Sequence, residues 1–115
     1  MPEKTIFSRI IDGEIPGQFV YQDELVVAIR DIRPAAPVHI LVIPRKPVRS
    51  LQDLEETDVE LAGRLLYAVR KIATQEGLEA GYRVVINTGE EGGQTVPHLH
   101  LHILGGKRLS EKMLP

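Results

Sequence analysis

The sequence His98-Leu99-His100-Leu101-His102-Ile103 places three of the chain's four histidines at alternate positions. Successive side chains of a β-strand point to opposite faces of the sheet. A strand over 98–104 therefore carries three imidazoles on one face and apolar side chains on the other. Imidazoles on alternate residues start about 7 Å apart, at about 3.4 Å of rise per residue. We expect the functional site on this strand, with its apolar face turned to the core.

Length and composition indicate one globular domain over residues 1–115, with an extended tail over 107–115. The absence of cysteine excludes disulfides, thiolate metal sites and cysteine nucleophiles. A net charge of −2 and a pI of about 6.1 give no basic surface for a long nucleic acid. Apolar runs are too short to cross a membrane, and the first residues lack the apolar segment of a secretory signal. We expect a cytoplasmic protein with no membrane or nucleic-acid partner.

Turn and cap signals divide the chain into helices and strands. A cap at Thr5 predicts a short helix that ends at Gly13, and a capping box formed by Thr57 and Glu60 predicts a long helix that ends before Gly77. Strands are predicted over 19–22, 25–29, 38–43, 82–87 and 98–104. This order favours an α+β fold, with a roughly five-stranded antiparallel sheet and one long and one short helix on one side of it.

The predicted long helix carries two apolar stripes. The first contains Val59, Ala62, Leu66, Val69 and Ala73, and the second contains Leu61, Leu65, Ala68 and Ile72. Together the stripes cover about half of the helix, whereas a helix on one sheet face needs an apolar arc of about 100°. A sheet alone would leave one stripe uncovered, so we predict that this helix also meets a partner subunit.

Four interpretations of the alternating histidines are open from the residues alone. They are a solvated polar face, a zinc site with His39 as a fourth ligand, a histidine nucleophile, and an anion site without turnover. Histidine suits nucleophilic attack on an acyl or phosphoryl centre because its ordinary pKa leaves much of it unprotonated at neutral pH.

The loop before the histidines favours phosphoryl chemistry. Residues 89–95 are rich in glycine, and exposed backbone N–H groups in such loops bind phosphate oxygens. Asn87 and Thr95 add side-chain donors nearby. A phosphate held there would lie close to the three histidines.

These motifs resemble the histidine triad (HIT) family. The resemblance rests on Gly92-Gly93-Gln94-Thr95 and the run from His98 to Gly106, and it extends through Thr5-Ile6-Phe7, Asp31-Ile32, Pro37-Val38-His39 and Leu41-Val42-Ile43-Pro44. It covers nearly the whole chain up to Gly106. The pair Gly105-Gly106 is similar to the Hint branch of the family.

The resemblance implies a hydrolase that cleaves the P–N bond of purine nucleoside 5′-monophosphoramidates through a nucleotidyl-histidine intermediate, with no cofactor and no metal. It also implies a homodimer with one sheet continuous across both subunits. The alternatives are a dinucleoside polyphosphate hydrolase and a purine nucleotide-binding protein without activity.

The resemblance also implies a role for individual residues. His100 would be the nucleophile, and His98 and His39 would orient the site and relay protons. The implied catalytic residues are His100, His98, His102, His39 and Thr95, and the implied nucleotide-binding residues are Phe7, Ile10, Asp31, Ile32, Asn87, Gly93, Gln94, His100 and His102. Thr95 would hydrogen-bond the leaving amine, and Asp31 would bind the ribose hydroxyls.

Overall fold

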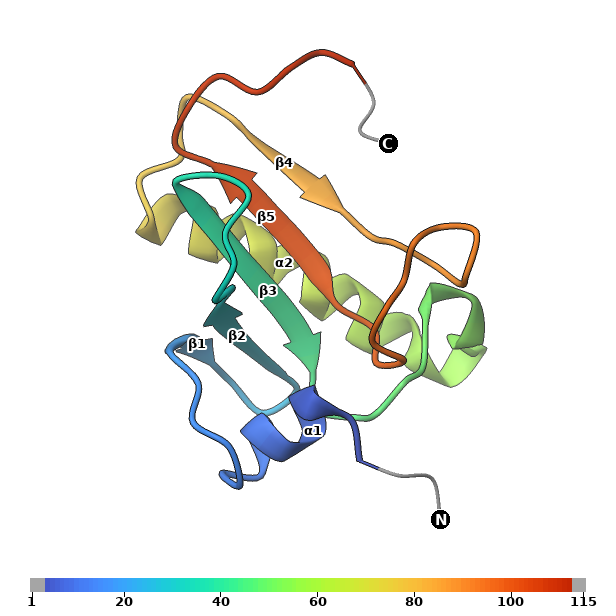
Figure 1. Ribbon diagram of the computed structural model, residues 1–115. Helices are drawn as coiled ribbons and strands as arrows, with labels where there is room; N and C mark the ends of the chain where they lie inside the picture. The colour runs from blue at the N-terminus through green and yellow to red at the C-terminus, as the bar shows by residue number, and fades with distance from the viewer. Residues whose placement is uncertain (1–3, 113–115) are drawn as a thin grey trace.

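A five-stranded antiparallel sheet, in the order β1-β2-β3-β5-β4, forms the centre of the computed structural model, which describes residues 4–112 (Figure 1). The strands are β1 (Phe19–Gln22), β2 (Val26–Arg30), β3 (Val38–Pro44), β4 (Tyr82–Val85) and β5 (Leu101–Gly105). The helices are α1 (Ile6–Ile11) and α2 (Val59–Gln75), and two 3-10 turns, η1 (Leu51–Asp53) and η2 (Glu56–Asp58), precede α2. The predicted α+β fold is confirmed. The last part of the predicted tail, residues 113–115, lies outside the described residues.

The two helices cover opposite faces of the sheet, which corrects the expectation that both lie on one side (Figure 1). Helix α2 packs over Ile40 and Val42 of β3, whereas Phe7 of α1 packs with Leu41 and Ile43 on the other face. The reason is that β3 is apolar at nearly every position, so both of its faces need a cover. The short α1 supplies that second cover.

The start of α2 also differs from the prediction, whereas its end agrees. Thr57 lies inside η2, and the capping box is formed by Glu55 and Asp58 instead of Thr57 and Glu60. The Asp58 carboxylate accepts a hydrogen bond from the Glu55 N–H at 3.0 Å and is held by the Lys46 ammonium at 2.6 Å. This ion pair explains why Asp58 takes the capping position. Gly77 ends the helix with a φ of 74°, as its place in the sequence predicts.

The strand that carries the histidines is shorter than predicted. It begins at Leu101, because the preceding N–H groups bond elsewhere: that of Leu99 donates to the Val48 carbonyl at 2.7 Å, and that of His98 to Val96 at 2.8 Å. The alternation of side chains nevertheless holds over the whole segment. Leu99, Leu101 and Ile103 lie in the core beneath α2, and the histidines face the α1 side.

The first apolar stripe of α2 is only partly covered. Val69 and Ala73 are buried, but Val59 and Leu66 are 69% and 59% exposed. Strand β4 pairs only with β5, so one of its edges is free. Within residues 4–112, the first half of the stripe is thus left largely exposed at Val59 and Leu66. In the same part of the chain, no helix has the length and apolarity needed to cross a membrane.

Candidate active site

All four histidines gather on the α1 side of the sheet. His39 comes from β3 and His102 from β5, while His98 and His100 lie just before β5. The ring centroids of His100 and His102 are 5.0 Å apart, and those of His102 and His39 are 5.2 Å apart. The Phe7 ring meets His100 edge-on at 4.9 Å. Pairing of β3 with β5 therefore brings His39 into the set that the alternation predicts.

His98 is fully buried, and its two ring nitrogens have opposite roles. Its Nε2 lies 2.9 Å from the Pro44 carbonyl oxygen, which can only accept, so Nε2 carries the proton. Its Nδ1 must then accept, and the Thr5 hydroxyl lies 3.0 Å away, with the Ser8 hydroxyl at 3.4 Å. Burial lowers the pKa of His98. A neutral His98 thus connects the start of α1 to the end of β3.

His100 has its free nitrogen on the side away from the backbone. Its Nδ1 lies 2.7 Å from the His98 carbonyl oxygen, so Nδ1 carries the proton and Nε2 keeps its lone pair. Within residues 4–112, no group hydrogen-bonds this Nε2. Burial lowers the pKa of His100 below its usual value, which keeps the ring neutral near pH 7. The arrangement supplies an unprotonated nitrogen that can act as a nucleophile.

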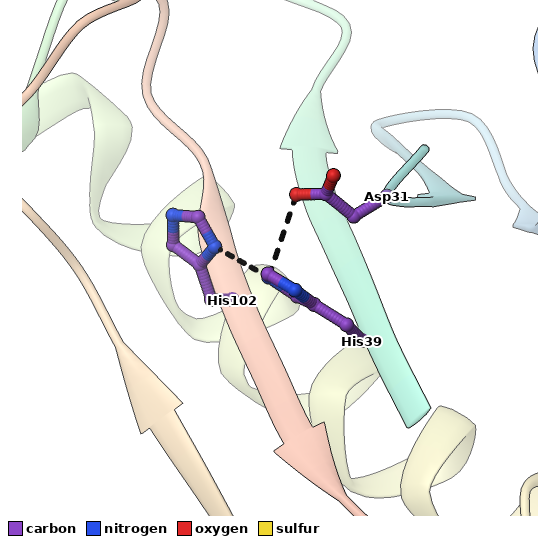
Figure 2. Close-up of side chains that lie close together, drawn as sticks. All are labelled: Asp31, His39 and His102. Carbon is purple, nitrogen blue, oxygen red and sulfur yellow. Dashed lines mark hydrogen bonds and ion pairs between the residues drawn. The ribbon is translucent and has the colours of Figure 1, made fainter. Parts of the chain in front are cut away.

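His39, His102 and Asp31 form a second group (Figure 2), and the His102 ring places this group beside His100, at 5.0 Å between ring centroids. The His39 Nε2 lies 2.9 Å from His102 Nδ1 and 3.5 Å from the Asp31 carboxylate. The backbone N–H of Ala35 donates to His39 Nδ1 at 3.0 Å. Burial lowers the pKa of His39, and burial together with the neighbouring histidines lowers the pKa of His102 to about 4. Both rings are therefore neutral at pH 7.

These three side chains also lie close enough together to bind one metal ion. One ligand atom from each of Asp31, His39 and His102 lies within 4.8 Å of the others. Two imidazole nitrogens and a carboxylate are donors that zinc accepts. Of the four histidines expected as zinc ligands, only His39 and His102 belong to this group, and Asp31 is the third candidate ligand.

The glycine-rich loop before the histidines is closed on itself. Gly89 and Gly93 have φ angles of 70° and 81°, and the Gln94 side chain binds the Gly89 N–H and the Arg49 and Val96 carbonyls. The N–H groups of Gly93 and Gln94 donate to carbonyls within the loop at 3.0 Å. Thr95, at the end of the loop, is exposed and carries a side-chain hydroxyl. A cavity of about 670 Å³ lies between this loop and residues 49–53.

The predicted base-binding residues are not all together. Phe7 and Ile10 are buried in the cluster beneath α1, whereas Ile32 is 91% exposed. Asn87 is half-buried near the loop. Ile32 directly follows Asp31, whose carboxylate accepts the Arg33 N–H at 2.8 Å. The expected pocket thus combines two buried side chains of α1 with one isoleucine that is almost fully exposed.

Several groups in the site have no signal in the sequence. The sequence predicts Thr5 as a helix cap, and it does cap α1. Nothing in the neighbouring sequence predicts its contact with His98, 93 positions away. Ala35 and Pro44 act through backbone atoms, which every residue type can supply. The spacing of histidines could identify the rings but not the groups that fix their protons.

The fold and the histidine cluster together define a histidine triad protein, and comparisons with known proteins agree. The HIT domain is matched over residues 12–109. The purine nucleoside phosphoramidase of Escherichia coli is 50% identical over 110 residues, which cover 95% of this chain and 92% of the relative. A 14 kDa zinc-binding protein of Zea mays is 52% identical over 108 residues, 92% of this chain and 84% of the relative.

A solved structure gives the same result for the fold. The HIT family hydrolase from Clostridium thermocellum aligns with a TM-score of 0.94 and 41% identity, over 99% of this chain and 100% of that chain. The chain belongs to the HIT family, and the resemblance seen in its motifs is confirmed.

Proposed function

We propose that this protein hydrolyses the P–N bond of purine nucleoside 5′-monophosphoramidates, with His100 as the nucleophile. The observation that carries the proposal is the His100 Nδ1–H bond to the His98 carbonyl at 2.7 Å, which leaves Nε2 unprotonated. The name of the Escherichia coli relative supports the substrate class.

The chemistry follows from that lone pair. The His100 Nε2 attacks the α-phosphorus, the P–N bond breaks, and the amine leaves after gaining a proton from solvent water. Water then attacks the phosphorus of the nucleotidyl-histidine, which releases a nucleoside monophosphate and restores His100. The His98 carbonyl accepts from Nδ1 throughout, so it stabilises the positive charge that the ring gains on attack. The neutral His102 is suited to donate to a phosphate oxygen, because its Nδ1 is already paired with His39.

The remaining roles follow the resemblance. Thr95 would hydrogen-bond the leaving amine, Asn87 would help to hold the phosphate, and Asp31 would bind the ribose. The N–H groups of Gly93 and Gln94 already donate to carbonyls within the loop, so these bonds would have to break before the two groups could bind the phosphate. Ile32 is free to lie against a purine ring because its side chain is 91% exposed. Buried Phe7 and Ile10 would form the floor of that pocket.

The experiment that tests the nucleophile is rapid trapping with an adenosine phosphoramidate, followed by mass spectrometry of the peptide that contains His100. We expect a nucleotidyl adduct on His100, and we expect His100→Asn to lose turnover while still binding the nucleoside monophosphate. The matched variant His39→Asn keeps the nucleophile and should still form the adduct, more slowly. An adduct elsewhere, or substantial activity of His100→Asn, would overturn the assignment.

The same assay separates the alternatives. A dinucleoside polyphosphate hydrolase would cleave adenine dinucleotides faster than the phosphoramidate. A protein that only binds nucleotides would retain the nucleoside monophosphate and release no amine from any phosphoramidate.

The exposed half of the α2 stripe supports the proposed homodimer. Val59 and Leu66 are largely exposed, and the free edge of β4 carries exposed Tyr82 and Val84. A free edge can pair with the same strand of a second copy, which would make one continuous sheet. We expect sedimentation to show a dimer for the native chain and a monomer for Leu66→Asp. A monomeric native chain at micromolar concentration would contradict the proposal.

A further inference from the structure

The backbone N–H of Ala35 determines which nitrogen of His39 carries a proton. It lies 3.0 Å from His39 Nδ1, and a backbone N–H can only donate. The Nδ1 must therefore present its lone pair, and the single proton of the neutral ring is on Nε2. His39 is buried, so no solvent-facing alternative competes with this bond.

The tautomer of His102 depends on that of His39. The His39 Nε2–H points to His102 Nδ1 at 2.9 Å, with the Asp31 carboxylate farther away at 3.5 Å. Since His102 Nδ1 accepts this bond, the proton of neutral His102 is on its own Nε2. One backbone donor thus orders the protons of two rings in sequence.

We propose that the Ala35 amide is a positioning group that fixes His39 and His102 as Nε2–H tautomers, and that it thereby closes the Asp31–His39–His102 group to divalent metal ions. The distances alone would admit a metal, since the ligand atoms lie within 4.8 Å of one another. The obstacle is the proton and not the spacing.

The argument against a metal follows from the number of protons on His39. Ligation through Nε2 needs the lone pair there, so the proton would move to Nδ1. It would then face the Ala35 N–H across 3.0 Å, two donors with no acceptor between them. Loss of one buried hydrogen bond of this kind weakens zinc binding about tenfold to a hundredfold. The maize relative is named for zinc, but this pair of donors does not fit a resident metal on His39.

The tautomers of His39 and His102 and the weak binding of metal ions follow from the geometry alone. The role of His102 toward a phosphate rests also on the proposed function. If His100 attacks phosphorus, His102 presents an Nε2–H to the phosphate because of Ala35. Failure of the trapping experiment would remove that consequence and leave the tautomers of the free protein unaffected.

The direct test is ¹⁵N NMR of the histidine rings in the native chain, with long-range ¹H–¹⁵N correlations at pH 7. We expect His39 and His102 to show a protonated Nε2 and an unprotonated Nδ1, and His100 to show the opposite pattern. A protonated Nδ1 on His39 would overturn the proposal. This measurement needs no substrate and no variant.

The second test compares Ala35→Pro, which lacks the N–H, with Ala35→Gly, which keeps it. The Ala35 side chain is exposed, so neither change removes core packing. Zinc affinity, measured by competition with a chromophoric chelator, should rise about tenfold to a hundredfold in Ala35→Pro and stay at the native value in Ala35→Gly. Adding His102→Asn to Ala35→Pro should abolish the gain. Equal zinc affinity of folded Ala35→Pro and Ala35→Gly would overturn the proposal, and if Ala35→Pro does not fold, the NMR result decides.

Discussion

Acidification should destabilise the folded protein through His102. Its pKa in the folded chain is about 4, against an ordinary value of 6.5. Each pH unit of difference corresponds to 1.36 kcal/mol, so the gap of about 2.5 units is worth about 3 kcal/mol of unfolding free energy.

The sign follows from which state binds the proton first. The unfolded chain protonates His102 near pH 6.5, whereas the folded chain resists until about pH 4. Stability is therefore complete above about pH 6.5, falls as the pH drops toward 4, and does not fall further through this group below that. The cause is burial, reinforced by the rings of His100 and His39, and opposed by the carboxylate of Asp31.

The assay is urea denaturation of the native chain and of His102→Asn at pH 7, 6, 5 and 4. His39, His98 and His100 also have lowered pKa values, but they are present in both proteins, so their own titration cancels in the difference. We expect the native chain to lose about 3 kcal/mol more than the variant between pH 7 and pH 4. Parallel stability curves for the two proteins would refute the reasoning, because they would show that His102 titrates alike in both states.

Three further changes test the packing around the site. Thr5→Val removes both the cap of α1 and the donor to His98, so denaturation should show a loss of about 1–2 kcal/mol, and an unchanged value would contradict the bond. Gly92→Ala would place a Cβ 2.3 Å from the Thr88 carbonyl oxygen, so the loop must move and steady-state turnover should fall about tenfold to a hundredfold. Ile72→Ala empties a fully buried position beneath α2 and should cost about 2–5 kcal/mol in the same denaturation assay.

Two matched variants serve as controls. Ser8→Ala removes the longer contact to His98, at 3.4 Å, and the 3.3 Å bond that the Ser8 hydroxyl accepts from Thr5, but it keeps the cap of α1 and should cost less than Thr5→Val. Leu51→Ala truncates a side chain that is 45% exposed and should cost much less than Ile72→Ala. If either control matched its partner in cost, the loss would not come from the named contact.

Periodicity predicted most of the fold because it reports burial directly. The apolar strand over 38–43 and the place of Gly77 both agree with the structure. The capping box did not, because a local pattern cannot show that Lys46, distant in the sequence, holds Asp58. The position of α1 was also missed. A run that is apolar on both faces demands a second cover, but it does not say which segment supplies it.

The sequence could predict which histidine rings gather in the site, but not which ring nitrogens carry the protons. Alternation predicts three imidazoles on one face, and His39 is a candidate both as a fourth zinc ligand and through the resemblance; the strand pairing brings its ring to 5.2 Å from His102. What fixes the tautomers is mostly backbone: the Ala35 N–H, the Pro44 carbonyl and the His98 carbonyl. Backbone groups have no signature in a sequence, so only the folded chain shows which of them meets a ring.

His100 has a free ring nitrogen because residues 98–100, which the sequence predicts as the start of the strand, do not join the sheet. Had the sheet ladder begun at His98, its carbonyl would be committed to a neighbouring strand. Because β5 begins at Leu101, that carbonyl accepts the His100 Nδ1–H at 2.7 Å. Regular pairing then resumes and sets His102 beside His39. Equal spacing in the sequence therefore yields unequal histidines. A carbonyl outside the ladder leaves Nε2 of His100 with a lone pair, whereas the Ala35 N–H, acting through His39, favours the tautomer of His102 that has its proton on Nε2.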